Sequence, residues 1–184
     1  MRQITFITSH PLKAEHLARH LDWPVTHLKL DLDEIQSLDP EEVVRKKALE
    51  AYAHVHAPVL VEDLSYLYAA MGKLPGPLFK WFLKELKPEG LCRLLDNYED
   101  RGATVHVAFA LTFDGMVVHV FVGEMHGRIA ATPRGVALFG ADSTFIPDGS
   151  SKTWGEMDEE ESARFSVRRI ALKKLETFLR QQSG

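Results

Sequence analysis

The stretch Pro58–Leu95, which reads PVLVEDLSYLYAAMGKLPGPLFKWFLKELKPEGLCRLL, decides the fold. Its apolar run Val59–Val61 predicts a buried strand. Glu62 and Asp63 follow this run, and acids at the carboxyl end of a strand in an α/β protein lie where ligands bind. Pro77 favours the first turn of a helix, because its missing N–H has no partner to lose there. We therefore expect carboxylates and a lysine around one site suited to a divalent metal with a polyphosphate.

Composition restricts the class of protein. The chain has 184 residues, of which 45% are hydrophobic and 26% charged, so we expect a single globular domain over residues 1–184, in one or two lobes. The formal charge of −4 gives no general case for nucleic-acid binding. Cys92 is the only cysteine, which excludes an internal disulfide and favours a reducing compartment. No secretory signal or membrane-length apolar stretch is present, so we expect a cytoplasmic protein without a membrane partner.

The first third of the chain alternates between strand and helix patterns. Strands are predicted at Ile4–Thr8 and Val25–Leu32, and helices at 13–21 and from an Asp39 cap to about His54. A strand that runs directly into a helix offers backbone N–H groups to an anion. Lys13 would add a positive charge there, although an isolated lysine is more often a solvated surface residue.

The second half begins with a hairpin pattern. Two β-rich runs, 104–113 and 116–122, flank Asp114-Gly115, and the β pattern continues to Ile129. Residues 139–149 are glycine-rich and aromatic, which is typical of a loop, and 166–179 predicts a final helix. This order of strands and helices predicts a mixed α/β or α+β fold.

Several common catalytic motifs are absent from the sequence. It contains no Walker A loop, no G-x-G-x-x-G after a strand and no G-x-S-x-G elbow. The nine histidines form no H-E-x-x-H pair, and one cysteine makes a zinc site an unlikely design. Cys92 lies in an apolar helical run, which favours a core position over a nucleophile.

A set of motifs in conserved order along the chain resembles the inosine triphosphate pyrophosphatase family. The matching segments cover nearly the whole length and are Val59–Asp63, Leu74–Pro77 with Lys80–Phe82, Pro133–Gly135, Gly140 with Asp142, Phe145–Gly149, Glu156–Met157 and Ser166–Arg168. The resemblance implies hydrolysis of a non-standard purine nucleoside triphosphate to monophosphate and pyrophosphate, with Mg²⁺ as cofactor. It also implies an elongated central mixed sheet flanked by helices, two lobes with a cleft between them, and a homodimer.

The resemblance also assigns roles to residues. Glu34 and Asp63 would bind the metal, and Asp63 or Glu62 would activate water, with Lys13 completing the catalytic set. Water would attack the α-phosphorus, and positive charges would stabilise the leaving pyrophosphate. The residues that would bind the substrate are Thr8, Ser9, His10, Lys13, Lys46, Lys80, Phe139, Gly140, Ala141, Asp142, Ser162, Val167 and Arg168.

The sequence departs from the family pattern mainly where the base would be read. Ala141 stands where the family usually has tryptophan, Ser162 where it has lysine, and Val167 where it has histidine. The phosphate loop also differs, because Ser9 and His10 replace Gly-Asn. Since lost polar contacts can change discrimination strongly, we expect altered base selectivity on a retained hydrolytic core. Two alternatives remain: a non-catalytic nucleotide-binding or regulatory protein, and a pyrophosphatase for modified pyrimidine nucleotides.

Overall fold

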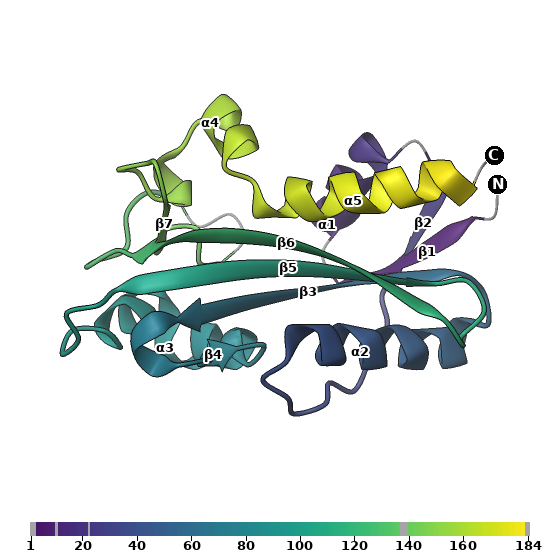
Figure 1. Cartoon of the computed structure of the whole chain (residues 1–184), viewed down its shortest axis with the longest axis horizontal. Coiled ribbons are helices and arrows are strands. Elements are labelled where there is room, and N and C mark those ends of the chain that lie inside the picture. The colour runs from purple at the N-terminus through teal and green to yellow at the C-terminus, as the bar shows by residue number, and fades with distance from the viewer. Residues whose placement is uncertain (1–2, 10, 22, 137–139, 183–184) are drawn as a thin grey trace. The chain divides into compact units, whose positions relative to one another are not determined.

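The computed structural model describes residues 3–9, 11–21, 23–136 and 140–182 (Figure 1). The elements in chain order are β1 (Ile4–Ile7), α1 (Pro11–His20), β2 (Val25–Leu28), α2 (Pro40–Val55), β3 (Val59–Tyr68), η1 (Ala69–Met71), β4 (Pro75–Gly76), α3 (Phe79–Arg93), β5 (Gly102–Thr112), β6 (Val118–Ile129), β7 (Phe145–Pro147), η2 (Trp154–Glu156), α4 (Glu159–Arg164) and α5 (Val167–Gln182).

The strands form one mixed sheet. Its order is β2-β1-β3-β5-β6-β7, with β4 paired to β3 outside this path. β1 runs parallel to β2 and to β3, whereas β4 is antiparallel to β3 and β7 is antiparallel to β6. Helices alternate with the strands in the N-terminal third, as the hydrophobic patterns indicated. The predicted fold class, a mixed sheet flanked by helices, is therefore confirmed.

The chain divides into two compact units, which agrees with the expected two lobes. The first unit holds residues 1–63, 107–123 and 168–184, and the second holds 64–106 and 124–167. By these bounds β3, β5 and β6 each contribute residues to both units.

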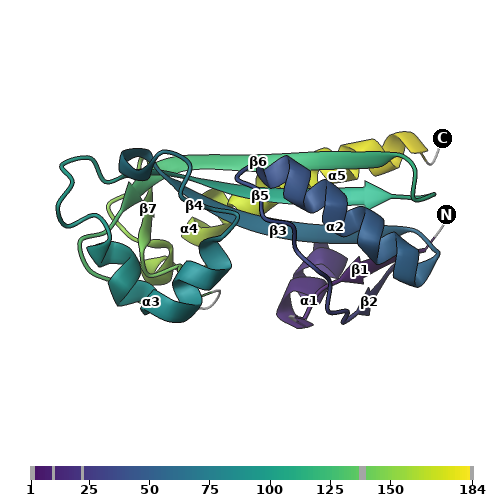
Figure 2. The ribbon, with the colours of Figure 1, turned by 90° about the horizontal axis from the view of Figure 1, so that it is seen from below.

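The first unit has a helix layer on each face of its strands. α2 lies on one face, and α1 and α5 lie on the other (Figures 1 and 2). α2 begins at the predicted cap, because the Asp39 carboxylate accepts hydrogen bonds from the N–H groups of Glu41 and Glu42. Small residues of α2, among them Ala48 and Ala51, pack with Val59 and Val61 of β3 in a buried core. This packing fixes the side chains that α2 presents to the end of Val59–Val61.

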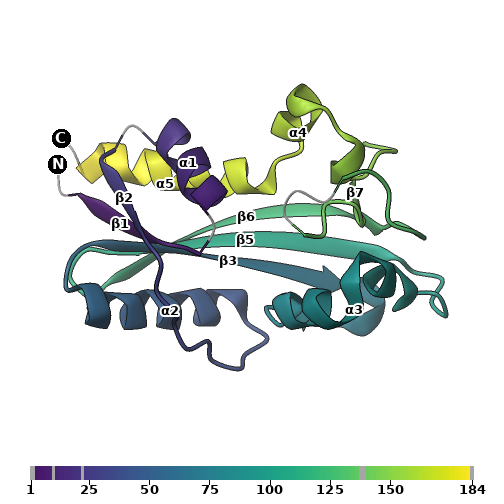
Figure 3. The ribbon, with the colours of Figure 1, turned by 180° about the vertical axis from the view of Figure 1, so that it is seen from behind.

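The second unit contains α3 and α4, which lie on opposite sides of its strands (Figure 3). α3 opens with Phe79, whose ring stacks on Tyr66 of β3 at 3.9 Å between centroids. The helix is interrupted at Lys87, which has a positive φ of 58° just before Pro88. The predicted break at this point is therefore confirmed, because a residue preceding proline avoids the helical region.

Four boundaries differ from the sequence prediction. β3 continues to Tyr68, because its last residues pair with β4, so Glu62 and Asp63 lie inside a strand instead of after it. Pro77 precedes α3, since Pro75–Gly76 is taken up by that pairing and the helix cap is Leu78. β2 ends at Leu28, and the predicted loop 139–149 contains the short strand β7.

Among the described residues, no helix combines the length and the apolar character that crossing a bilayer requires.

Candidate active site

Glu62 is the buried carboxylate of the first unit. It lies on β3, and its Oε1 atom is 3.3 Å from Nζ of Lys13 on α1. The same oxygen accepts hydrogen bonds from Nε and Nη2 of Arg168 on α5. Burial raises the pKa of Glu62, but the charges and hydrogen bonds of Lys13 and Arg168 outweigh it and hold the pKa at about 2. Glu62 is therefore ionised at neutral pH and bound to two cations.

Asp63 has a different set of partners. Its Oδ1 atom lies 3.9 Å from Nζ of Lys47 on α2, and the same ammonium group is 2.9 Å from Oε1 of Glu34. Burial raises the pKa of Asp63, Lys47 lowers it, and the charges of Glu34 and Glu62 raise it again, to about 6. Two acids thus converge on one positive charge.

The two neighbouring acids of β3 point in opposite directions, because successive side chains of a strand alternate between faces. Glu62 reaches the helices α1 and α5, whereas Asp63 reaches α2 on the other face (Figures 1 and 2). Their roles are therefore separable: Glu62 holds two cationic side chains, and Asp63 shares a cation with Glu34.

The carboxylates of Glu34 and Asp63 suit a hard divalent cation. Both already surround the ammonium group of Lys47, which stands where positive charge is favourable. Mg²⁺ prefers such oxygen donors and commonly completes its coordination with water and substrate phosphates. Within the described residues, no group of three or more His, Cys, Asp and Glu side chains is arranged to hold a metal. The pair therefore fits Mg²⁺ as a shared ligand set, with the remaining positions left to a phosphate chain and water.

Lys47 is the residue that sequence reasoning missed, since the neighbouring Lys46 was predicted instead. Lys46 is exposed, whereas Lys47 is half-buried and contacts both acids. Lys47 follows the buried Val43 and Val44 by four and three residues, so it shares the inward side of α2. Helical spacing from these valines could have identified it.

The remaining phosphate-side residues lie at the end of β1. Thr8 donates its backbone N–H to the Leu28 carbonyl and accepts a contact from the His27 ring at 3.1 Å. Ser9 is exposed next to it. His10, predicted for this loop, lies outside the described residues, as does Phe139 of the predicted base pocket.

The predicted base-side residues lie in the second unit, with one exception. Gly140 has a φ of +93°, and a Cβ there would lie 2.7 Å from a methyl of Leu83. Ala141 and Val167 are buried, Ser162 lies half-buried on α4, and Lys80 is exposed with its Nζ 5.7 Å from the Trp81 ring centroid. Arg168, predicted to face the base or sugar, instead belongs to the first unit and pairs with Glu62.

Comparison with known proteins identifies the family. The Ham1 family model matches residues 4–178, which is nearly the whole chain. The chain belongs to the Ham1 family. A curated Ham1 relative, inosine triphosphate pyrophosphatase 2 of Trypanosoma cruzi, is 41% identical over 92% of this chain and 88% of its own length. The predicted membership of the inosine triphosphate pyrophosphatase family is thereby confirmed.

Solved structures support the same Ham1 assignment. A HAM1 protein from Coxiella burnetii superimposes with a TM-score of 0.87 at 25% identity, over 98% of this chain and 100% of that one. A dITP/XTP pyrophosphatase from Mycobacterium abscessus reaches a TM-score of 0.76 at 26% identity, over 94% of this chain and 98% of that one.

Proposed function

We propose that this Ham1 protein hydrolyses a nucleoside triphosphate to the nucleoside monophosphate and pyrophosphate. The observation that carries the proposal is the convergence of Glu34 and Asp63 on Lys47, beside a Glu62 that is held ionised. The printed names of relatives, inosine triphosphate pyrophosphatase and dITP/XTP pyrophosphatase, agree with this reaction. The family model spans residues from both units, so both would act as one functional domain.

In this proposal Glu34 and Asp63 hold Mg²⁺. The ion, when bound, would neutralise phosphate charge and polarise the phosphoryl group. Lys47 gives up its two carboxylates at that point and offers its ammonium group to the phosphate chain. Lys13 and Lys80 add further positive charge, which favours departure of pyrophosphate because charge builds on the leaving oxygens.

Asp63 is the better candidate to orient the attacking water. One oxygen of Glu62 accepts from both Lys13 and Arg168, so this carboxylate serves chiefly to position those cations. Asp63, with its pKa raised to about 6, is closer to the pKa that suits a general base at neutral pH. Glu62 would thus be a positioning residue and Asp63 the residue next to the reacting water.

We also propose altered base selectivity. Ala141 and Val167 are buried and apolar, and Ser162 carries a short hydroxyl, so these three side chains offer few donors to a purine 6-oxo group. A site that lacks such donors discriminates weakly against bases without the oxo group. The enzyme would then accept a wider or different range of bases than hypoxanthine and xanthine.

The test is pyrophosphate release from a panel of nucleoside triphosphates with Mg²⁺. We expect turnover by wild type and a loss of roughly 100-fold or more in Asp63→Asn. Glu41→Gln, which removes an exposed carboxylate from α2, is the control and should stay near wild type. Tight nucleotide binding without pyrophosphate release would overturn the proposed reaction and favour a binding protein. An exclusive preference for ITP and XTP would overturn the proposed selectivity.

A further inference from the structure

The short helix η2 connects the two segments that carry the proposed base-side residues. The N–H of Gly155 donates to the carbonyl of Asp142 at 2.8 Å. The indole Nε1 of Trp154 donates to the carbonyl of Phe165 at 2.9 Å. Phe165 caps α4 and lies between Ser162 and Val167. Two adjacent residues of η2 therefore bridge the loop around Asp142 and the junction between α4 and α5, all within the second unit.

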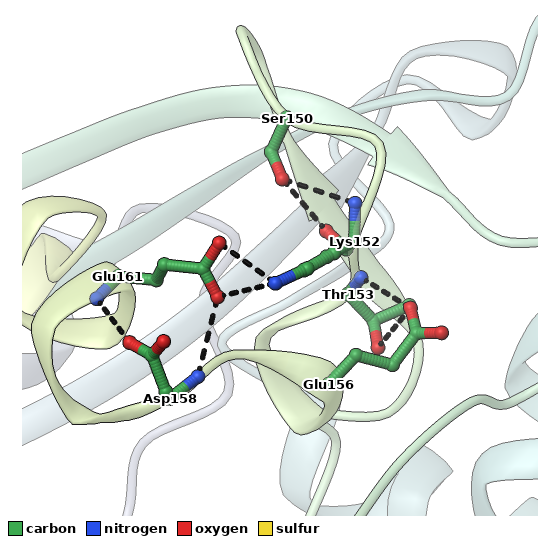
Figure 4. Close-up of polar contacts among 6 residues, drawn as sticks. All are labelled: Ser150, Lys152, Thr153, Glu156, Asp158 and Glu161. Carbon is green, nitrogen blue, oxygen red and sulfur yellow. Dashed lines mark hydrogen bonds and ion pairs between the residues drawn. The ribbon is translucent and has the colours of Figure 1, made fainter.

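The bridge is itself held rigidly. Thr153, which is fully buried, and Glu156 form a capping box around η2 (Figure 4). The Thr153 hydroxyl also donates to the carbonyl of Arg134 at 2.8 Å. The Trp154 ring packs against Phe145 with centroids 4.5 Å apart. Because η2 is fixed to its surroundings, the indole N–H can fix the position of Phe165.

Gly155 fits its place for a steric reason. A Cβ on this residue would lie 2.8 Å from the Val136 carbonyl oxygen and 2.9 Å from that of Arg134. The close approach brings the Gly155 N–H to Asp142, so the spacing between η2 and the loop at Asp142 is set by backbone contacts. The indole of Trp154 is then the adjustable part of the bridge, since a side-chain change can remove its donor alone.

A second link to α4 is exposed to solvent. Lys152 Nζ lies 2.8 and 2.7 Å from the two carboxylate oxygens of Glu161 (Figure 4). Both side chains are partly exposed, and exposed ion pairs contribute little because water screens them and side-chain ordering opposes them. The half-buried indole contact is consequently the stronger determinant of where α4 ends.

We propose that Trp154 is a positioning residue for base selection in the reaction proposed above, on which this inference rests. Its N–H keeps the α4–α5 junction, with Ser162 and Val167, at a fixed place relative to Asp142. The groups proposed to handle phosphate and metal, Glu34, Lys47 and Asp63, belong to the first unit and do not contact Trp154 in any interaction of the described residues. Loss of the N–H therefore weakens recognition of the base and leaves phosphoryl chemistry intact.

The experiment compares wild type with Trp154→Phe, which keeps a ring against Phe145 but removes the donor. Pyrophosphate release is measured across the nucleoside triphosphate panel. We expect KM for the preferred nucleotide to rise about 3- to 10-fold with kcat nearly unchanged, because one net hydrogen bond is lost from binding. The ratio of kcat/KM between the best and worst bases should fall by a similar factor.

Two controls separate positioning from general effects. Tyr98→Phe conserves a ring at an exposed side chain, and Lys152→Met removes the solvent-exposed link to α4; both should keep the base preference of wild type. Trp154→His retains a ring N–H and should restore part of the selectivity. An unchanged KM and base preference in Trp154→Phe, or an equal loss for every base through kcat, would overturn the inference.

Folding and the outcome for inactive protein are read independently. Cys92, the only cysteine, is fully buried, so its protection from a thiol reagent reports an intact second unit in each variant. If Trp154→Phe exposes Cys92, Trp154→His decides: wild-type selectivity supports the inference, and altered selectivity despite a retained donor contradicts it. If wild type releases no pyrophosphate, the proposed reaction fails, and dissociation constants for the same nucleotides then decide whether Trp154→Phe changes base preference.

Discussion

Arg168 donates from both Nε and Nη2 to a single oxygen of Glu62, although 106 positions separate the two residues in the chain. Lys13, 49 positions before Glu62, approaches the same oxygen at 3.3 Å. The carboxylate therefore ties together α1, β3 and α5. Its side chain is only 3% exposed, so water gives this cluster little of the screening that weakens surface pairs.

Replacing Glu62 with glutamine should destabilise the protein by about 2–3 kcal/mol. The amide keeps the shape but leaves Lys13 and Arg168 without their shared negative charge, and unpaired charges are costly where water is excluded. The measurement is the free energy of unfolding from urea titrations without metal. Glu41→Gln is the matched control, because it breaks an exposed pair with Arg45 and should cost less than about 0.5 kcal/mol. Equal losses in the two variants would contradict the assigned importance of Glu62.

The stabilisation by Glu62 should depend on pH in one direction. Its pKa falls from 4.5 to about 2 on folding, so the folded protein favours the ionised form. The difference in unfolding free energy between wild type and Glu62→Gln should be constant above about pH 5 and shrink as the pH falls from 4.5 to about 2. Asp63, whose pKa rises from 3.8 to about 6, acts oppositely and loses stabilisation as the pH rises through that window. Because Asp63 is present in both proteins, its effect largely cancels, and a difference that grows toward acid pH would refute the prediction.

Lys47→Met should have opposite effects on metal and substrate. The ammonium group competes with a cation for Glu34 and Asp63, so its removal should tighten Mg²⁺ binding to the nucleotide-free protein by about 3- to 10-fold. The same change should raise KM for the triphosphate, because a positive charge near the phosphate chain is lost. Titration calorimetry with Mg²⁺ alone and steady-state kinetics measure the two effects.

Two further lysine variants make that result specific. Lys173→Met removes an equal charge from an exposed position on α5 and should leave Mg²⁺ affinity unchanged. Lys46→Met tests the neighbour that the sequence first indicated. A larger change from Lys46 than from Lys47 would mean that the contact with the two acids does not govern metal binding.

The sequence predicted the elements well where local patterns dominate. The Asp39 cap, the hairpin around Asp114-Gly115 and the break at Lys87 all depend on near neighbours, and each is present. The continuation of β3 through Tyr68 was missed, because its stability comes from pairing with Pro75–Gly76 across a turn. The short strand β7 was missed for the same reason, since it exists by pairing with β6.

For the site, residue types were easier to predict than directions. The sequence indicated Glu34, Glu62 and Asp63, but the alternation that sends the last two to opposite faces follows only once both are known to lie inside β3. The choice between Lys46 and Lys47 depends on the phase of α2, which its buried valines define. The pairing of Arg168 with Glu62 joins distant segments, and no local pattern signals it.

Tyr68→Phe should stabilise the protein. The Tyr68 side chain is fully buried, and its hydroxyl has no hydrogen-bond partner among the described residues. A buried hydroxyl without a partner loses its hydrogen bonds to water on folding, so removing it should raise the free energy of unfolding by about 0.5–1.5 kcal/mol. Urea titrations measure the change, and Tyr98→Phe, at a side chain that is 48% exposed, should give a change close to zero. A loss of stability in Tyr68→Phe would mean that the hydroxyl is satisfied in solution, for example by a buried water, and that this part of the second unit is more polar than its side chains indicate.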